Sequence, residues 1–230
     1  MESKSNEKIR RLLVIGLLAS IVTVLGGELP IGWVEYPRLE NDPTGLLGMM
    51  AGSGRLSLLQ LACGVFFGGI GIPLQYFGFE AVAQLVEQGE CKKSAKLIHL
   101  GAAATAGLGG IVHVICVALM FLCRVTDLSG SALPQPLLDF TLWLVLPISV
   151  VFMPIYYAMT LSLFLAVLRG KTCLPRWAAV FNPLTATLLL NSLPMLLPTS
   201  AFVNALGMAN MGLGSVLCFG GILALMKKAE

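Results

Sequence analysis

Two ionisable side chains, Glu28 and His113, lie within long apolar runs of this sequence. A charged side chain at the centre of a bilayer costs upward of ~2.5 kcal/mol, so residues kept at such depth are candidates for function. A carboxyl group and an imidazole can exchange protons, which is the chemistry of acid–base catalysis and of proton-linked transport. We take Glu28 and His113 as the candidate catalytic pair, in a pocket that opens outward. The simpler alternative is that Glu28 is an interfacial cap and that His113 satisfies a carbonyl of a kinked helix.

Other polar residues in or beside the apolar runs form two predicted groups. The outer group would join Glu28 and His113 as ligand-binding residues: Asp139, Asn191, Asn204 and Asn210. The inner group lies toward the cytoplasm: Gln75, Glu80, His99, Tyr156, Tyr157 and Asn182. From it we take Gln75, Glu80 and Tyr156 as ligand-binding candidates, while Glu80 and His99 could meet across an inner loop. The alternative is that these residues only mark the interface, where tyrosine is common.

The motifs of metal, nucleotide and serine chemistry are absent from the sequence. It contains no H-E-x-x-H, no G-x-x-x-x-G-K-[ST] and no G-x-S-x-G. The two histidines stand alone, and no pair among the six cysteines forms C-x-x-C. We therefore predict no metal and no cofactor. Cys91 and Cys173 fall in predicted cytoplasmic loops, which disfavours a disulfide.

The elements that must position these residues are membrane helices. The chain is 57% hydrophobic and 12% charged, whereas globular domains carry roughly 25% charged residues. About 20 apolar residues are needed to cross a hydrocarbon core of about 30 Å. We predict an all-α integral membrane bundle, a single domain over residues 1–230. Its six transmembrane helices would span 11–28, 57–78, 98–122, 138–168, 177–197 and 201–226.

The loops predict an orientation. Twelve of the 15 Lys and Arg residues fall in four stretches: Lys4–Arg11, Lys92–Lys96, Arg169–Arg176 and Lys227–Lys228. Cytoplasmic loops retain such residues, so both termini are predicted to be cytoplasmic, in a bacterial inner membrane. The outside loop 29–56 could cap a pocket mouth or be a simple interfacial spacer. The net charge of +3 is small, so we expect membrane lipids and no nucleic acid as partners.

Two predicted helices contain prolines that could open a cavity. The second carries Pro73, and the fourth carries Pro147 and Pro154. Proline removes a backbone donor and kinks a helix, and the freed carbonyls need new partners. A tilted bundle without a cavity is the alternative. The short connection after residue 197 predicts that the fifth and sixth helices pack as an antiparallel hairpin.

Several segments together resemble a known family. They are Gly27-Glu28-Leu29, Gly71–Phe79, His113, Leu168–Thr172, and Pro175-Arg176-Trp177 through Asn182-Pro183. The sequence resembles, over nearly its whole length, a family of small bacterial six-helix inner-membrane proteins classed as a domain of unknown function. In that family the first-span acidic position is commonly Asp, so the resemblance makes Glu28 its longer counterpart. The resemblance implies an architecture and no activity.

Three functions remain open at this point, and the sequence does not decide whether the protein is an enzyme. The first is binding of, or action on, a lipophilic small molecule in an outward-facing pocket, where isomerisation would need only Glu28 and His113. The second is a small proton-linked carrier that could work as a homo-oligomer. The third is a non-catalytic assembly partner of a membrane complex, which a bundle without an internal cavity would favour.

Overall fold

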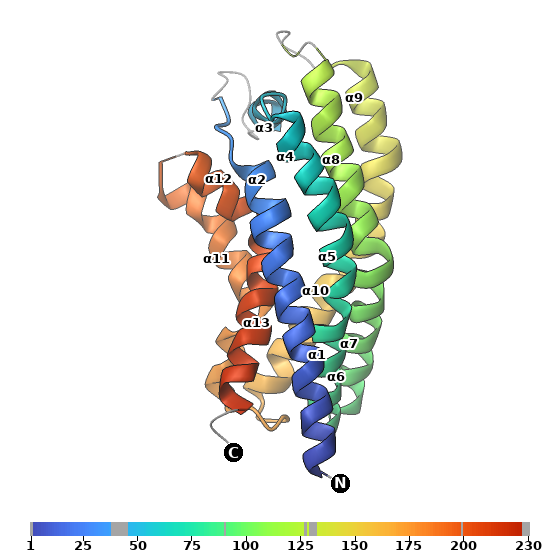
Figure 1. Cartoon of the computed structure of the whole chain (residues 1–230), viewed down its shortest axis with the longest axis vertical. Coiled ribbons are helices and arrows are strands. Elements are labelled where there is room, and N and C mark those ends of the chain that lie inside the picture. Colours follow the sequence, from blue (N-terminus) through green and yellow to red (C-terminus); the bar gives the residue numbers. More distant parts are fainter. Residues whose placement is uncertain are drawn as a thin grey trace.

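The computed structural model describes residues 2–37, 46–89, 91–126, 128, 133–198 and 200–226. Throughout this described part the regular structure is helical, and it contains no strand. The long helices run side by side along one axis and form an elongated bundle (Figure 1). The all-α prediction is confirmed for these residues.

Four helices are long and apolar enough to cross a membrane: Asn6–Gly32, Leu58–Gln88, Lys92–Val125 and Gln135–Leu168. Each is assembled from shorter elements that continue one another. The first contains α1 (Glu2–Val22), η1 (Thr23–Glu28) and α2 (Leu29–Gly32). The second contains α4 (Leu58–Cys63), η2 (Gly64–Gly68), α5 (Gly69–Leu74) and α6 (Tyr76–Gln88). The third contains α7 (Lys92–Ala104), η3 (Thr105–Gly109) and α8 (Gly110–Val125), and the fourth α9 (Gln135–Phe140), η4 (Thr141–Val145) and α10 (Leu146–Leu168).

These helices extend further than the predicted spans. The second was expected to end at 78 but continues to Gln88, and the third begins at Lys92. The predicted inner loop 79–97 therefore shrinks to the link from Gly89 to Cys91. Hydropathy marks where a segment leaves the hydrocarbon, but a helix satisfies its own backbone and can continue into water.

The last third of the chain differs most from the predicted spans. The expected helix 177–197 is a short 3₁₀ helix, η5 (Arg176–Val180), followed by α11 (Pro183–Leu196). Asn182 separates them in extended conformation, and its Oδ1 accepts a hydrogen bond of 2.8 Å from the N–H of Leu184. Its Nδ2 donates to the carbonyl of Thr160 in α10 at 3.1 Å, as an interhelical bond. With 14 residues, α11 is about 21 Å long, short of a full span.

The expected helix 201–226 is divided at Ala209. Its parts are α12 (Ala201–Met208) and α13 (Asn210–Met226), which are bent by 63°. Length and composition thus support four spans among the described residues, or five if the bent pair is one span. α11 packs along α13, as expected for a hairpin.

The predicted outside loop 29–56 is partly helical. Its first residues continue the first long helix as α2, and α3 covers Leu46–Ser53. Two side chains tie this region to the bundle. Arg124 donates to the carbonyl of Leu56 at 2.5 Å, and Gln60 Nε2 donates to the carbonyl of Pro30 at 2.8 Å.

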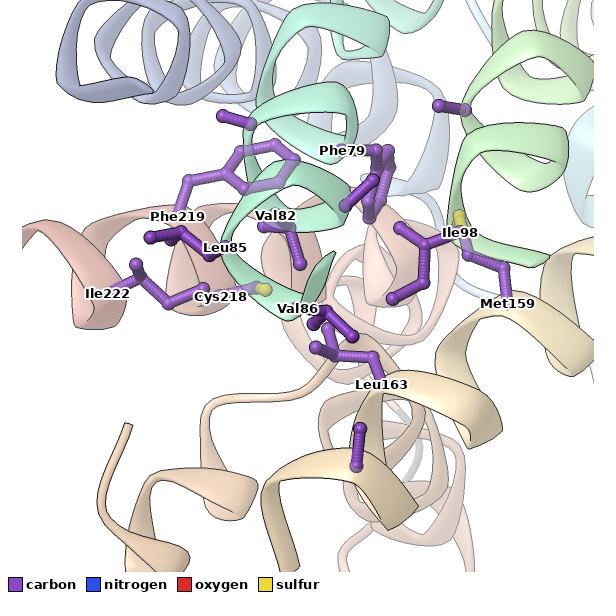
Figure 2. Close-up of a cluster of buried hydrophobic side chains, with 14 of the residues drawn as sticks. Phe79, Val82, Leu85, Val86, Ile98, Met159, Leu163, Cys218, Phe219 and Ile222 are labelled. Carbon is purple, nitrogen blue, oxygen red and sulfur yellow. The ribbon is translucent and has the colours of Figure 1, made fainter. Parts of the chain in front are cut away.

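The start of α1 and the end of α13 lie at the same end of the bundle (Figure 1). A dense apolar core fills that part of the bundle. Its side chains come mainly from α6, α7, α10 and α13, and Figure 2 shows them around α6. The rings of Phe79 and Phe219 pack edge to face with centroids 4.9 Å apart. Gly78 lies directly against the Phe219 ring, which leaves no room there for a side chain. This core closes one end of the bundle, and the cavity described next lies beyond it.

Candidate functional site

A cavity of about 720 Å³ lies between the long helices and the bent pair α12–α13. This volume is typical of small-molecule sites. The wall is mostly apolar and contains five methionines: Met49, Met120, Met153, Met208 and Met211. Six of the predicted site residues line it: Glu28, Gln75, His113, Tyr156, Asn204 and Asn210. The structure therefore joins four members of the outer group to two members of the inner group.

Two π-helical turns, η1 and η3, contribute residues to the lining of this cavity. Glu28 ends η1, η2 supplies the carbonyl that His113 contacts, and Thr105 of η3 lies in the wall. A π-turn shifts the backbone hydrogen-bond pattern by one residue, and such turns are frequent at functional sites. Neither η2 nor η4 contributes a residue to the lining. The first and third long helices thus depart from α-helical geometry where they border the cavity.

Glu28 is buried, with 6% of its surface exposed. Its Oε2 atom has no hydrogen-bond partner. The carboxyl group lies against Gly212, in the first turn of α13, where any side chain would occupy the place of Oε2. The absence of a side chain at Gly212 therefore makes room for the carboxyl group.

His113 has one defined contact. Its Nε2 lies 3.0 Å from the carbonyl oxygen of Gly64 in η2. Because a carbonyl only accepts, Nε2 carries the hydrogen, and Nδ1 is the nitrogen that could accept a proton from a bound molecule. The ring lies over Gly68, where a methyl group would collide with it. His113 thus satisfies a carbonyl, as the simpler sequence interpretation held, while also lining the cavity.

The asparagines organise the bend in the last helix. Asn210 Nδ2 donates to the carbonyl of Gly207 at 2.6 Å and to Oδ1 of Asn191 at 2.9 Å. The Asn210 oxygen Oδ1 is left without a partner. Asn204 Nδ2 donates to the carbonyl of Val34 at 2.8 Å. Asn191 itself is exposed and outside the cavity wall, so its contact with the site is indirect.

Tyr156 is buried at the inner part of the wall, between Phe79 and Phe152. Its hydroxyl group has no hydrogen-bond partner. Ser215 lies nearby but donates instead to the carbonyl of Met211 at 3.1 Å. Together with Glu28 and Asn210, Tyr156 presents a third buried polar atom that no described group satisfies.

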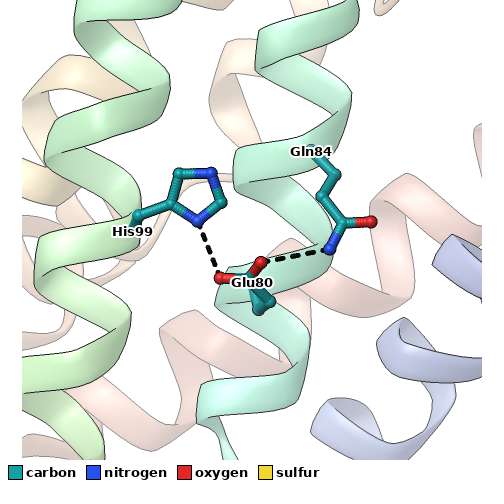
Figure 3. Close-up of polar contacts among 3 residues, drawn as sticks. All are labelled: Glu80, Gln84 and His99. Carbon is teal, nitrogen blue, oxygen red and sulfur yellow. Dashed lines mark hydrogen bonds and ion pairs between the residues drawn. The ribbon is translucent and has the colours of Figure 1, made fainter.

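Besides Asn191, two further predicted ligand-binding residues lie outside the cavity wall. Asp139 is exposed on α9, where it accepts a hydrogen bond of 2.7 Å from Gln135. Glu80 contacts His99 at 2.7 Å and Gln84 at 3.1 Å (Figure 3). Glu80 and His99 do meet, but in a separate contact between α6 and α7, outside the cavity wall. The residues of Figure 3 therefore support the packing of two helices and do not border the pocket.

Several residues of the cavity wall could not be recognised as site residues from the sequence. The methionines, Thr105, Tyr36 and Phe152 are of residue types that membrane helices and their borders use everywhere. Gly212 and Gly207 were recognisable only as small residues suited to helix packing. Among the described residues, no three His, Cys, Asp or Glu side chains are grouped as metal ligands would be.

Comparisons with known proteins place the chain by family alone. Neither the curated proteins nor the solved structures contain a match to it. The model of a family of unknown function, DUF6796, matches residues 1–229. The chain therefore belongs to this family of unknown function.

Proposed function

We propose that this protein crosses the bacterial inner membrane six times and binds a lipophilic small molecule in the cavity. One observation carries the binding proposal. Three buried polar atoms without partners, Glu28 Oε2, Tyr156 Oη and Asn210 Oδ1, belong to residues that line one largely apolar cavity. A buried polar group left unsatisfied costs roughly 1–3 kcal/mol. A bound molecule that hydrogen-bonds these atoms would offset that cost.

The topology part of the proposal has η5 together with α11 as the fifth crossing and the bent pair α12–α13 as the sixth. Its support is the distribution of Lys and Arg, which favours a cytoplasmic location for both termini. The start of α1 and the end of α13 lie at the same end of the bundle (Figure 1). The cavity then opens toward the outer face, where Tyr36 and Met49 line it.

Cys173 offers a test of this orientation. It is exposed in the segment between α10 and η5, which the proposal puts in the cytoplasm. We expect a membrane-impermeant maleimide to label it in inside-out vesicles and not in intact spheroplasts. Partial burial raises the pKa of the Cys173 thiol. Because the thiolate is the reactive form, labelling should accelerate with pH and need a higher pH than an ordinary thiol. Loss of the signal in Cys173→Ser assigns it, and labelling in spheroplasts would contradict the orientation.

A cavity-filling variant tests binding. Gly207 borders the cavity, and no atom lies within 4 Å of the position that a Cβ would occupy there. We expect Gly207→Leu to fold as well as wild type, because leucine favours helix over glycine by up to about 1 kcal/mol. The added side chain should nevertheless exclude the bound molecule. The measurement is mass spectrometry of small molecules that purify with the protein, expected in wild type and depleted at least tenfold in Gly207→Leu.

Gly107 supplies the matched control. It too has open space around its Cβ position, but it is exposed on η3 in a shallow groove outside the cavity. Gly107→Leu should keep the co-purifying molecule at the wild-type level. If wild type carries no such molecule, or if both variants retain it equally, the binding proposal fails.

In its catalytic form the proposal assigns proton transfer to Glu28 and His113. A carboxyl group and an imidazole Nδ1 on one cavity could remove and return a proton, as isomerisation requires. Such chemistry predicts conversion of the bound molecule by wild type, with at least about a hundredfold loss in Glu28→Gln. Retained conversion in that variant would exclude Glu28 from the chemistry.

The bend at Ala209 favours a second candidate, a proton-linked carrier. Membrane carriers often place their substrate where a helix is discontinuous, and α13 begins beside Glu28. Proteoliposomes would then dissipate a pH gradient when the co-purifying molecule is added, and vesicles that stay sealed would exclude this candidate. The assembly-partner hypothesis expected a filled interior, and the cavity takes away that support.

A further inference from the structure

We infer that the molecule bound in the cavity is a lipophilic amine whose ammonium group is held by Glu28, an inference that rests on the proposed binding function. The cavity wall carries no permanent positive charge among its described residues. Among the described residues that line the cavity there is no Lys or Arg. The Nε2 hydrogen of His113 already points at the carbonyl of Gly64. Glu28 lines the cavity, and its Oε2 has neither a cationic nor a hydrogen-bonding partner among the described residues.

The start of α13 offsets only part of the cost of burying a carboxylate at Glu28. The backbone amide of Gly212, in the first turn of this 17-residue helix, faces the carboxyl group. The N-terminal end of a helix carries partial positive charge and stabilises a nearby anion. A buried carboxylate still costs a great deal unless an opposite charge neutralises it. The described wall contains no such cation, so a positively charged ligand would supply it.

The unsatisfied oxygen of Asn210 requires a hydrogen-bond donor. Both Nδ2 hydrogens of Asn210 are used, by Gly207 and Asn191, so its free atom is the accepting oxygen. Asn210 and Gly212 both line the cavity at the start of α13. A protonated primary amine offers three N–H donors on one charged atom and could reach Glu28 and Asn210 together. The Tyr156 hydroxyl can accept from the same group.

The rest of the wall favours a ligand with an apolar body, and Glu28 disfavours a ligand that carries a negative charge. The five methionines of the wall are flexible and polarisable, and they adapt to apolar bodies of varied shape. A fatty acid would fit such a wall, but its carboxylate would face the carboxylate of Glu28. The expected order of affinity is amine, then alcohol, then carboxylate.

The test is a matched series on one hydrocarbon chain: tetradecylamine, tetradecyltrimethylammonium, tetradecanol and tetradecanoate. The readout is the concentration that gives half of the maximal thermal stabilisation of the full chain in nanodiscs. We expect the amine to act at a concentration at least about tenfold below the alcohol, as a charge-assisted hydrogen bond allows. The quaternary compound keeps the charge but has no N–H, so it should be weaker than the amine. The carboxylate should not stabilise.

The Glu28→Gln variant should bring the amine and the alcohol to within about threefold of each other. Gly207→Leu should abolish stabilisation by the whole series, and Gly107→Leu should preserve it. If tetradecanol matches the amine in wild type, or if Glu28→Gln keeps the amine preference, the inference fails while the binding function stands. If no member stabilises wild type and nothing co-purifies with it, both fail. The wild-type ranking needs no variant, so misfolding of Glu28→Gln leaves the inference testable.

Discussion

The Gly16→Leu variant is expected to unfold at a much lower temperature than wild type. A Cβ at Gly16 would lie 2.5 Å from the backbone nitrogen of Gly78, so α1 and α6 touch there backbone to backbone. Overpacking usually costs about 1–3 kcal/mol, and here the obstacle is a main chain that cannot rotate away. We expect a loss of about 3 kcal/mol or more. For a chain of this size that lowers the unfolding temperature by roughly 6–12 °C. Thermal unfolding in detergent, followed by tryptophan fluorescence, measures it.

Gly220→Leu is the control for this prediction. Gly220 belongs to α13 and also faces α1, but its nearest neighbour is the end of the Leu17 side chain at 3.8 Å. That variant should unfold within a few degrees of wild type. Equal losses in both variants would show that leucine is harmful in this region for a reason other than the contact of α1 with α6.

The all-α fold class was predictable because it follows from hydrophobicity along the chain. The apolar runs located the long helices, and Glu28 and His113 were selected because they are ionisable residues within those runs. Such a selection does not say which side of a helix a residue occupies. α10 has no distinct polar face, so its sequence pattern did not predict that Tyr156 points into the bundle. Asp139 shows the limit, since its depth suited the outer group but its side chain lies on an exposed face of α9.

The bend at Ala209 and the π-helical turns could not be predicted from the sequence, for a different reason. The bend at Ala209 involves neither proline nor a glycine at that position. It coincides with Asn210, whose side chain takes the carbonyl of Gly207. Asparagine side chains compete in this way with the backbone, but most asparagines in helices do not, so the residue type alone predicts no bend. At η2 the carbonyl of Gly64 lies 3.0 Å from His113 Nε2 of α8, a contact between helices that the pattern within one helix does not reveal.

The Gly68→Ala variant is expected to displace His113 and to lose the bound molecule. The added methyl group would occupy the place of the imidazole ring, which now lies directly over Gly68. His113 would have to rotate away and give up its 3.0 Å contact with the carbonyl of Gly64. A buried carbonyl without a partner costs roughly 1–3 kcal/mol, so we expect a destabilisation of about 2 kcal/mol. The displaced ring would enter the cavity, and the co-purifying molecule should fall at least tenfold.

Gly69→Ala separates the position of His113 from general effects of alanine in this helix. Its Cβ would meet only the end of the Val114 side chain at 3.1 Å, which can yield by a few tenths of an ångström. Gly69 borders the shallow outer groove and lies outside the cavity wall. We expect a change in stability below about 1 kcal/mol and full retention of the bound molecule. If Gly68→Ala also retains it, the placement of His113 over Gly68 has no part in binding. If both variants lose it, the cavity depends on the backbone of the second long helix and not on the imidazole. Only loss in Gly68→Ala with retention in Gly69→Ala ties binding to the geometry that joins η2 and α8.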